Sequence, residues 1–326
     1  MKTFTKLALV SSMALSANAF AMQAMDDSAL SATTGQDGLS IGIGISKIEI
    51  EKLFIHDNDG LNGTIDNAGA IVIQGNGTGL TATKGVVITA PLDLTNPASP
   101  EVDESRTIAS HNLADLKIDS DAGTGGGNSA FINIAADVSG LDIYIGEIGV
   151  TASGKQGEAS TTSALRRGGV DANYNAILSG LTLKTGPMSA NIQLGAAPQG
   201  AMIKLNTTML GGLEINDLGI LDNSTANADR AAGEIFIESI KIADANANDL
   251  SIKQDISVYG ASLNNPDEKG YIEIVSHGGA KDHYIKGVHL GSKTAASIGD
   301  VEIQGMQTYY GPTMSDQGAV ITIRGH

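Results

Sequence analysis

The chain has 326 residues, with 36 Asp and Glu against 20 Lys and Arg, and its formal net charge is −16. Because such a surface repels the phosphate backbone, we expect no nucleic-acid partner. The sequence contains no cysteine, which excludes thiol catalysis and thiolate metal sites, and it is long enough to bury a core without disulfides.

The first 21 residues have the order of features found in a secretory signal peptide. Lys2 and Lys6 precede an apolar run over residues 7–15, and small residues follow it up to Ala21. The run is too short to cross a bilayer, which needs about 20 apolar residues, and no later run predicts a transmembrane segment. We expect cleavage after Ala21 and export to the periplasm, the outer-membrane surface or an extracellular fibre. Loss of the two lysines changes the formal charge from −16 to −18.

Residues 22–38 form an N-terminal motif before the first clear strand. Residues 26–33 predict at most one helical turn, with Asp26 or Asp27 as its N-cap, and Gly35 and Gly38 predict a tight turn. The motif has two interpretations. It is either a structural cap that leads into the first strand or a docking tag for a secretion or assembly partner.

From residue 39 onward the apolar residues recur with a period of two, which is typical of strands with one buried face. Leu39 to Ile45 alternate in one phase, and the alternation restarts one residue later at Ile48. Such a slip predicts a β-bulge near Ser46 and Lys47. Further alternating runs lie at residues 71–73, 86–88, 113–118, 131–134, 141–145, 181–183, 191–194, 202–205, 213–215, 235–237, 240–242, 250–252, 272–274, 298–303 and 320–323.

These runs predict an all-β fold with very little helix; the best helical candidate besides the first is residues 160–167. A loose repeat, one strand followed by a second, recurs at residues 129–145, 200–220 and 233–252. Its spacing is irregular, so both a stacked β-coil of the solenoid type and a long β-sandwich remain open. No connection is long or biased enough to be an interdomain linker, and we therefore expect one elongated domain over residues 39–326.

Two short motifs suggest chemistry but lack its context. Residues 38–42 match a nucleophile elbow around Ser40, which requires a strand, a sharp turn and a helix, and no helical pattern follows. Residues 57–60 look like the start of a calcium loop, but the sixth and twelfth positions hold Asn62 and Ala68, so a simple turn is favoured.

The remaining candidates predict no catalytic, cofactor or metal site. The Gly-rich residues 123–127 lack the ending of a phosphate loop. His277, His283 and His289 recur every six residues, but the glycines between them interrupt a strand, and we interpret them as isolated surface residues. No pair can be singled out among the 36 carboxylates for acid–base work.

The stretch at residues 22–41 carries a resemblance. Its Met-Asp-Asp, Leu-Ser and Thr-Gly-Gln-Asp-Gly-Leu segments resemble the N-terminus of the FilA group of pilus-system proteins of Acinetobacter-type bacteria, and a wider group of exported Gram-negative proteins looks similar here. Beyond residue 50 only the β-rich, Gly- and Asn-rich character agrees. The resemblance implies a role in pilus assembly and brings no catalytic residues with it.

We therefore expect a non-enzymatic structural or assembly protein of a pilus or surface-fibre system. Its partners would be other proteins of that system, with self-association as a further option. We predict no cofactor, although the acidic surface leaves calcium open. Two alternatives remain: a surface adhesin or ligand-binding module, calcium-assisted in one version, and a secreted hydrolase on a β scaffold.

Overall fold

The computed structural model describes residues 38–60, 63, 68–93, 101–123, 129–155, 165–262, 264 and 269–324. The signal peptide, the turn at residues 26–33, most of the glycine-rich loop and most of the helical candidate at residues 160–167 lie outside these ranges. Contacts group Ser40–His326 as one unit. No helix among the described residues is long and apolar enough to cross a membrane.

Two large antiparallel sheets dominate the described residues, which confirms the all-β prediction. Sheet A contains, in spatial order, β1 (Leu39–Ile43), β8 (Ala114–Asp121), β9 (Phe131–Val138), β13 (Met188–Gly195), β14 (Ile203–Met209), β17 (Leu250–Tyr259), β18 (Tyr271–Ser276) and β23 (Ala319–Arg324). The main path of sheet B contains β2 (Lys47–Ile50), β5 (Val86–Thr89), β10 (Asp142–Ile145), β12 (Asn175–Lys184), β15 (Leu213–Asp222), β16 (Gly233–Asp244), β19 (Lys281–Gly291) and β20 (Ser297–Met306).

Smaller elements complete the fold. A branch of sheet B beside β12 consists of β11 (Glu147–Ala152), β4 (Gly69–Gln74) and β3 (Leu53–His56). Two short hairpins pair β6 (Leu92–Asp93) with β7 (Glu101–Val102) and β21 (Tyr309–Tyr310) with β22 (Asp316–Gln317). The 3₁₀ turns whose bounds the described residues give are η3 (Gly79–Thr81), η4 (Glu104–Arg106), η5 (Asp171–Asn173) and η6 (Asn223–Thr225).

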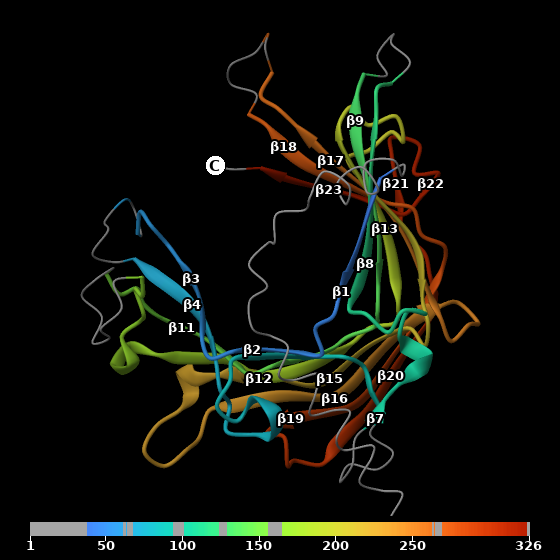
Figure 1. The fold of residues 1–326 in the computed structure, drawn as a ribbon. Helices are drawn as coiled ribbons and strands as arrows, with labels where there is room; N and C mark the ends of the chain where they lie inside the picture. Colours follow the sequence, from blue (N-terminus) through green and yellow to red (C-terminus); the bar gives the residue numbers. More distant parts are fainter. Residues whose placement is uncertain are drawn as a thin grey trace, which may run out of the picture. The chain divides into compact units, whose positions relative to one another are not determined.

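The chain passes back and forth between the two sheets as a single meander (Figure 1). We call each stretch that runs through one sheet and on into the other an arm, and the short connection inside it a link. The arms are β1–β2, β5–β8, β9–β10, β12–β13, β14–β15, β16–β17, β18–β19 and β20–β23. Successive arms alternate in direction, so the first runs from sheet A to sheet B and the eighth runs from sheet B to sheet A.

This topology explains the loose repeat in the sequence. Residues 129–145 contain β9 and β10, residues 200–220 contain β14 and most of β15, and residues 233–252 contain β16 and the start of β17. Each repeat is therefore one arm, and the first two are farther apart because β11 and the arm β12–β13 lie between them. Every pairing with a defined register is antiparallel, so two antiparallel sheets are formed rather than a coil of parallel strands.

The phase slip near Ser46 has a different cause from the one we predicted. Ile43 ends β1 in sheet A and Lys47 begins β2 in sheet B, so the slip marks a link between sheets and the prediction of a bulge was wrong. A change of sheet reorients the buried face, and the alternation of apolar residues shifts with it.

One row of aliphatic side chains crosses each sheet, and we call these rows the aliphatic ladders. In sheet A the ladder consists of Ile118, Ile134, Ile192, Ile203, Ile256, Ile274 and Ile321. In sheet B it consists of Ile48, Ile88, Ile143, Leu183, Ile215, Ile240, Ile285 and Val301. The inner members are half-buried, whereas Ile48, Val301 and Ile321 are exposed. Direct cross-strand neighbours of this kind stabilise a sheet and fix its register.

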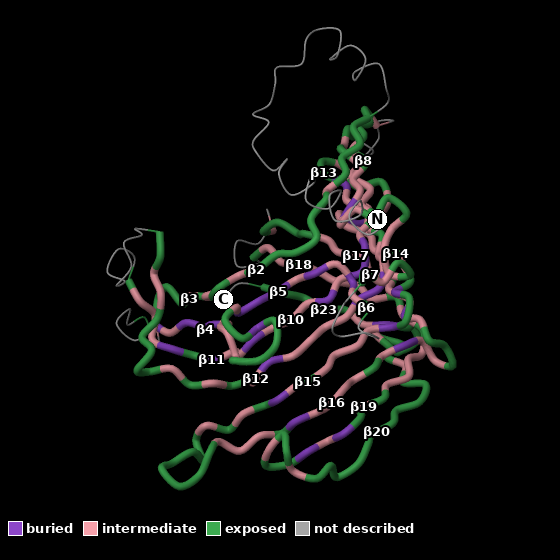
Figure 2. The backbone as a smooth tube through the Cα atoms, turned by 60° about the horizontal axis from the view of Figure 1, so that its bottom comes forward, coloured by how far each residue is buried: buried purple, intermediate pink, exposed green. Residues whose placement is uncertain are grey.

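Many of the well-buried positions on the main path lie in or next to a link, but others lie near the hairpins at the far ends of the strands, among them Gln193, Ala201, Phe236 and His289. Buried residues in or next to a link include Ala114, Ser139, Asp142, Thr185, Met209, Ala243 and Leu250. Figure 2 shows that the buried segments are short and that β20 is exposed throughout. A second buried group lies in β4 and β5 and includes Val72 and Val87.

Candidate functional site

A buried ion pair fastens one link to its neighbours. Arg106 Nη2 lies 2.6 Å from Asp142 Oδ1, and the Asp142 side chain is wholly buried while that of Arg106 is 14% exposed. The Arg106 guanidinium also donates to the carbonyls of Leu141 and Thr185, and the Leu92 N–H donates to Asp142 Oδ2 at 3.0 Å. Because every one of these partners belongs to the fold, the pair holds the links together and leaves no polar group for a ligand.

Glycines let successive links approach closely. A Cβ on Gly140 would lie 2.5 Å from the Thr185 carbonyl oxygen, and one on Gly186 would lie 2.5 Å from the Leu210 amide nitrogen. Gly212, with a φ of +80°, would place a Cβ 2.6 Å from the carbonyl oxygen of Ile242. In each case the obstacle is backbone of the next arm, which cannot move aside cheaply, so these links need residues without a side chain.

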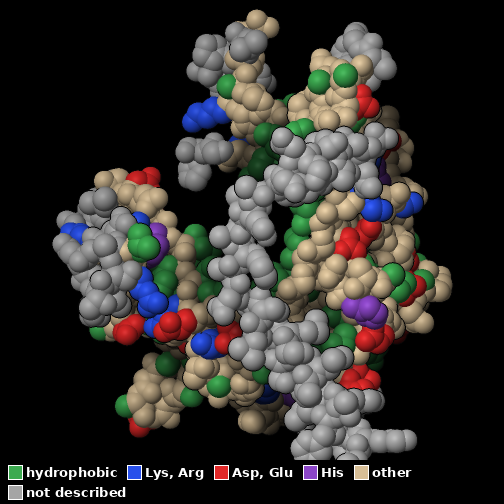
Figure 3. Space-filling model, in the orientation of Figure 1, with side chains coloured by type: hydrophobic (Ala, Val, Ile, Leu, Met, Phe, Trp, Pro, Cys, Tyr) green, Lys and Arg blue, Asp and Glu red, His purple; other side chains and the backbone are tan. Residues whose placement is uncertain are grey.

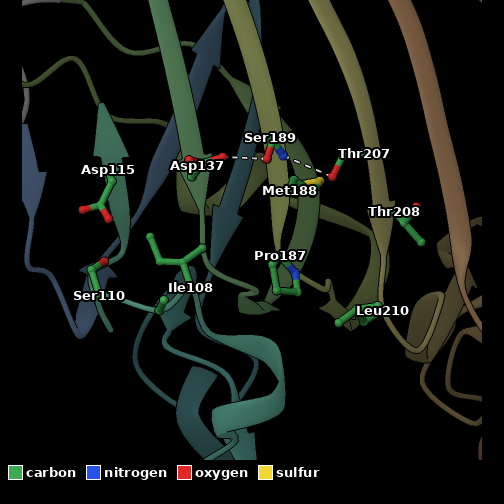
Figure 4. Close-up of a pocket in the computed structure, with 11 residues that line it drawn as sticks. Ile108, Ser110, Asp115, Asp137, Pro187, Met188, Ser189, Thr207, Thr208 and Leu210 are labelled. Carbon is green, nitrogen blue, oxygen red and sulfur yellow. Dashed lines mark hydrogen bonds between the residues drawn. The ribbon is translucent and has the colours of Figure 1, made fainter. Parts of the chain in front are cut away.

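An open hollow of about 460 Å³ lies beside the links on sheet A (Figure 4). Ser189 Oγ donates to Asp137 Oδ1 at 2.6 Å, and the Ser189 N–H donates to Thr207 Oγ1 at 3.1 Å. Asp115 lies directly across the strand pair from Asp137. Hydrogen bonds from Ser110 and Asn112 lower the pKa of Asp115, so its carboxylate is charged at neutral pH.

The polar side chains of this hollow are suited to hydrogen bonding. Its polar groups are hydroxyls and two carboxylates, and its apolar lining includes Pro187, Met188 and Leu210. The contact of Ser189 with Asp137 is exposed, so the carboxylate is a weak base for that serine. Among the described residues no group of three or more His, Cys, Asp or Glu side chains is placed to hold a metal ion.

A larger hollow, of about 1020 Å³, lies where β2 and β3 meet the end of β11 and residues 165–171. His56 Nδ1 lies 2.8 Å from Ser153 Oγ, and Arg167 Nη2 donates to the same oxygen at 2.8 Å. Burial and the charge of Arg167 lower the pKa of His56, so its ring is neutral at pH 7. The hydroxyl proton of Ser153 is then left for His56 Nδ1 or for the Gly154 carbonyl.

This Ser–His contact lacks two parts of an acyl-transfer site. The N–H groups of Ser153 and Gly154 already donate to the carbonyls of Ala68 and Gly168, so neither is free to bind an oxyanion. No hydrogen bond joins a carboxylate to His56 among the described residues. The contact therefore joins β3 to the residues that follow β11, and it is not a complete catalytic set.

Charged side chains of both signs line the same hollow. They are Glu49, Glu51, Lys52, Lys155, Arg166, Arg167 and Asp171. Figure 3 shows basic and acidic side chains side by side over the region that Figure 1 labels β2 to β4. Arg166 lies 3.9 Å from Glu51, and Arg167 is held by the Asn58 side chain and the Gly154 carbonyl. Arg166 thus has an acidic neighbour, whereas the hydrogen-bond partners of Arg167 are neutral oxygens that hold its side chain in place.

The two sequence motifs adopt the structures we favoured. Ser40 lies inside β1, and no helix follows it in the described residues, so it does not occupy a nucleophile elbow. At residues 57–60 the Asp59 N–H donates to Asp57 Oδ1 at 3.2 Å, which closes a local turn. Asn58 Oδ1 accepts from Arg167, so this turn is fastened to residues 165–171.

The three spaced histidines occupy different environments. His277 is exposed and lies 3.1 Å from Asp255, as expected for a surface residue. His289, however, is buried at 9% exposure, contacts Glu238 and packs edge-on against Phe236, so its interpretation as a surface residue was wrong. His283 lies directly across from Ile242 in β16 and from Ile303 in β20. Its Nε2 is buried and has no hydrogen-bond partner. A regular strand would align these residues, but His277 lies just after β18 in the link to sheet B, whereas His283 and His289 lie in β19.

The terminal arms expose the edges of both sheets. In sheet A, β1 pairs only with β8 and β23 only with β18, and in sheet B, β2 pairs only with β5 and β20 only with β19, as far as the described residues show. Both ends are apolar as well as unpaired: Ile41 is 37% exposed, Ile48 36%, Val301 47% and Ile321 54%. Exposed edges of this kind offer backbone N–H and C=O groups to another chain.

Comparison with known proteins gives a partial match. A model of a family of unknown function, DUF6160, matches residues 1–123. These residues include the first two arms and end just after β8. No curated protein matches the chain. No solved structure matches it either.

Proposed function

We propose that this protein is an exported, non-enzymatic structural or assembly subunit of a pilus or surface-fibre system. The observation that carries the proposal is the meander with two open ends, because unpaired sheet edges suit a protein whose task is to join other chains. The signal-like residues 1–21, the resemblance of residues 22–41 and the acidic, cysteine-free composition support export to such a system.

The polar clusters favour a structural role over an enzymatic one. Arg106 and Asp142 are satisfied within the fold, and the contact of Ser153 with His56 lacks free oxyanion donors. The partners on this proposal are other proteins of the same surface system.

Deletion of the gene in its native cell tests the proposal. We expect loss or shortening of surface fibres in electron micrographs, with recovery when the gene is restored. Surface protease treatment of intact cells and fractionation locate the protein at the same time. Unchanged fibres, adhesion and biofilm would reject the proposal.

The hollow around Asp137 and Ser189 favours a second candidate, a surface ligand-binding module. Its adjacent hydroxyls and carboxylates suit hydrogen bonding to a polyhydroxylated ligand or to a cation with oxygen ligands. Calorimetric titration with Ca²⁺ and with neutral oligosaccharides tests it. Binding that Asp137→Ala abolishes would favour this candidate, and no heat at millimolar Ca²⁺ removes the calcium-assisted version.

A further inference from the structure

The number and direction of the arms decide how a second copy of the chain can add to the first. The eighth arm, β20–β23, runs from sheet B to sheet A, and the first arm, β1–β2, runs from sheet A to sheet B. When the first arm of a second copy lies beside the eighth arm of the first copy, the two are antiparallel in both sheets at once. An odd number of arms would have made them parallel, so the even number keeps the native pairing pattern.

The side chains at the two ends also match. The sheet B ladder begins at Ile48 and ends at Val301, both exposed, so joining the ends would set these two aliphatic residues against each other. In sheet A, Ile321 ends the ladder. Ile41 lies on the same apolar face, because the neighbouring Gly42 points toward Asp115 on the polar face. Each exposed terminal residue would gain the cross-strand neighbour that the inner ladder residues have.

The register that pairs Val301 with Ile48 also brings opposite charges together. In the next row of sheet B, Glu302 ends one side and Lys47 begins the other. The same register sets Asp300 across from Glu49. Asp300 is already bonded to the Tyr284 hydroxyl and the Gly287 N–H, and Glu49 is paired with Lys47 and Lys84. Lys47 would thus lie between Glu49 of its own copy and Glu302 of the other, and Lys84, 3.8 Å from Glu49, adds a second positive charge beside these acids.

We propose that a second copy of this chain docks head-to-tail, its β1 and β2 continuing the two sheets beyond β23 and β20. The contact is heterologous, so it repeats and yields an open filament rather than a closed dimer. Sheet A supplies the longer regular edge, because β23 pairs with β18 without a register shift. In sheet B the contact is confined to the regular segment around Val301, since β20 is bulged on both sides of it. In naming the partner, this inference rests on the proposed function.

The absence of native cysteine allows a direct test. Two single variants, Ile48→Cys and Val301→Cys, are made in the full-length gene, purified in the form that the cell produces, mixed and mildly oxidised. Residues directly opposite in an antiparallel pair lie within disulfide range. We expect the yield of disulfide-linked heterodimer to be at least tenfold higher than the yield from a matched control pair, Ile132→Cys with Ile220→Cys. The control residues are similarly exposed, at 44% and 42%, but lie on inner strands β9 and β15.

The outcomes of cross-linking separate the docking modes. Heterodimers in the edge pair alone support head-to-tail docking. Homodimers of either single variant at the same level would show like-with-like contact and overturn the proposal. Equal cross-linking of the edge and control pairs would also overturn it.

A second measurement does not depend on a disulfide. Sedimentation over a range of concentrations should show the mass of the native chain rising in steps of one chain. In Val301→Lys and Ile321→Lys we expect the association constant to fall at least tenfold, with an unchanged circular dichroism spectrum. A native chain that stays monomeric at every concentration would overturn the proposal. If that result accompanied loss of surface fibres on gene deletion, self-docking would fail while the proposed function would stand; the reverse pair of results would reject the function alone.

Discussion

The links and the aliphatic ladders stabilise the molecule by different means. The inner links are closely packed around polar groups, with Asp142 wholly buried and glycines such as Gly140 and Gly186 facing the next arm. The ladders are apolar and only half-buried along most of their length, and they end in exposed residues such as Ile321. The difference indicates that the links hold each arm in place, while the ladders set the register and leave the two ends open to extension.

Breaking the buried ion pair should have the largest effect on stability. Asp142→Ala leaves the Arg106 charge buried without its carboxylate, and we expect a loss of about 3–5 kcal/mol in the free energy of unfolding. The exposed pair of Arg166 and Glu51, 3.9 Å apart, provides the control: Glu51→Ala should cost less than about 1 kcal/mol. Urea denaturation followed by circular dichroism measures both. Equal losses would show that the links are no more sensitive than the surface.

Adding a side chain at a closely packed link glycine should cause the next largest loss of stability. Gly186→Ala places a Cβ 2.5 Å from the Leu210 amide nitrogen, and overpacking of this kind costs about 1–3 kcal/mol. Gly279→Ala is the matched control, because Gly279 also lies in a link but has no atom within 4 Å of its ideal Cβ position. Thermal unfolding should show a lower melting temperature for the first variant and little change for the second. A similar decrease in both would mean that the close approach to Leu210 is not what sets the cost.

The middle and the end of one ladder should respond differently to truncation. Ile203→Ala removes a half-buried side chain with neighbours on both sides, and we expect a loss of about 1–2 kcal/mol, below the range for fully buried positions. Ile321→Ala removes a 54% exposed side chain with a neighbour on one side, and should cost about 0.5 kcal/mol. Guanidinium denaturation at low protein concentration, where self-docking does not contribute, compares the two.

Acid should weaken the links through Asp244, which lies where β16 ends. Burial alone would raise the pKa of this carboxyl, but hydrogen bonds from Lys281 and Ser251 outweigh it and lower the pKa. Because the folded pKa is depressed, its contribution is complete above the unfolded value of about 3.9 and is lost as pH falls through the folded value.

Asp244→Asn should therefore lower stability by on the order of 1 kcal/mol at pH 7, and the two chains should converge as pH falls below the folded pKa of Asp244. Stability measured by urea denaturation across this range tests the prediction. A constant difference between the two chains at every pH would show that the carboxylate charge is not what matters.

Much of the local structure was predictable from the sequence. Every alternating run that we took as a strand overlaps one, with boundaries that differ by one or two residues in places, because alternation follows directly from the pleat of a strand. The sequence did not indicate β19, since its charged residues, histidines and Gly287 disguise the alternation. It also placed Asp142 on the polar, outward side of its run, whereas the structure buries it against Arg106, 36 positions earlier in the chain.

The sequence by itself determined that this chain is a series of short strands with one apolar face each, and that it is acidic and free of cysteine. Only the tertiary structure decided that each repeat is an arm shared by two sheets, that the slip at Ser46 is a change of sheet, and that the arms are even in number. The physical reason is that periodicity records which face of a strand is buried. The choice of neighbouring strand depends on backbone hydrogen bonds and close approaches between residues far apart in the chain.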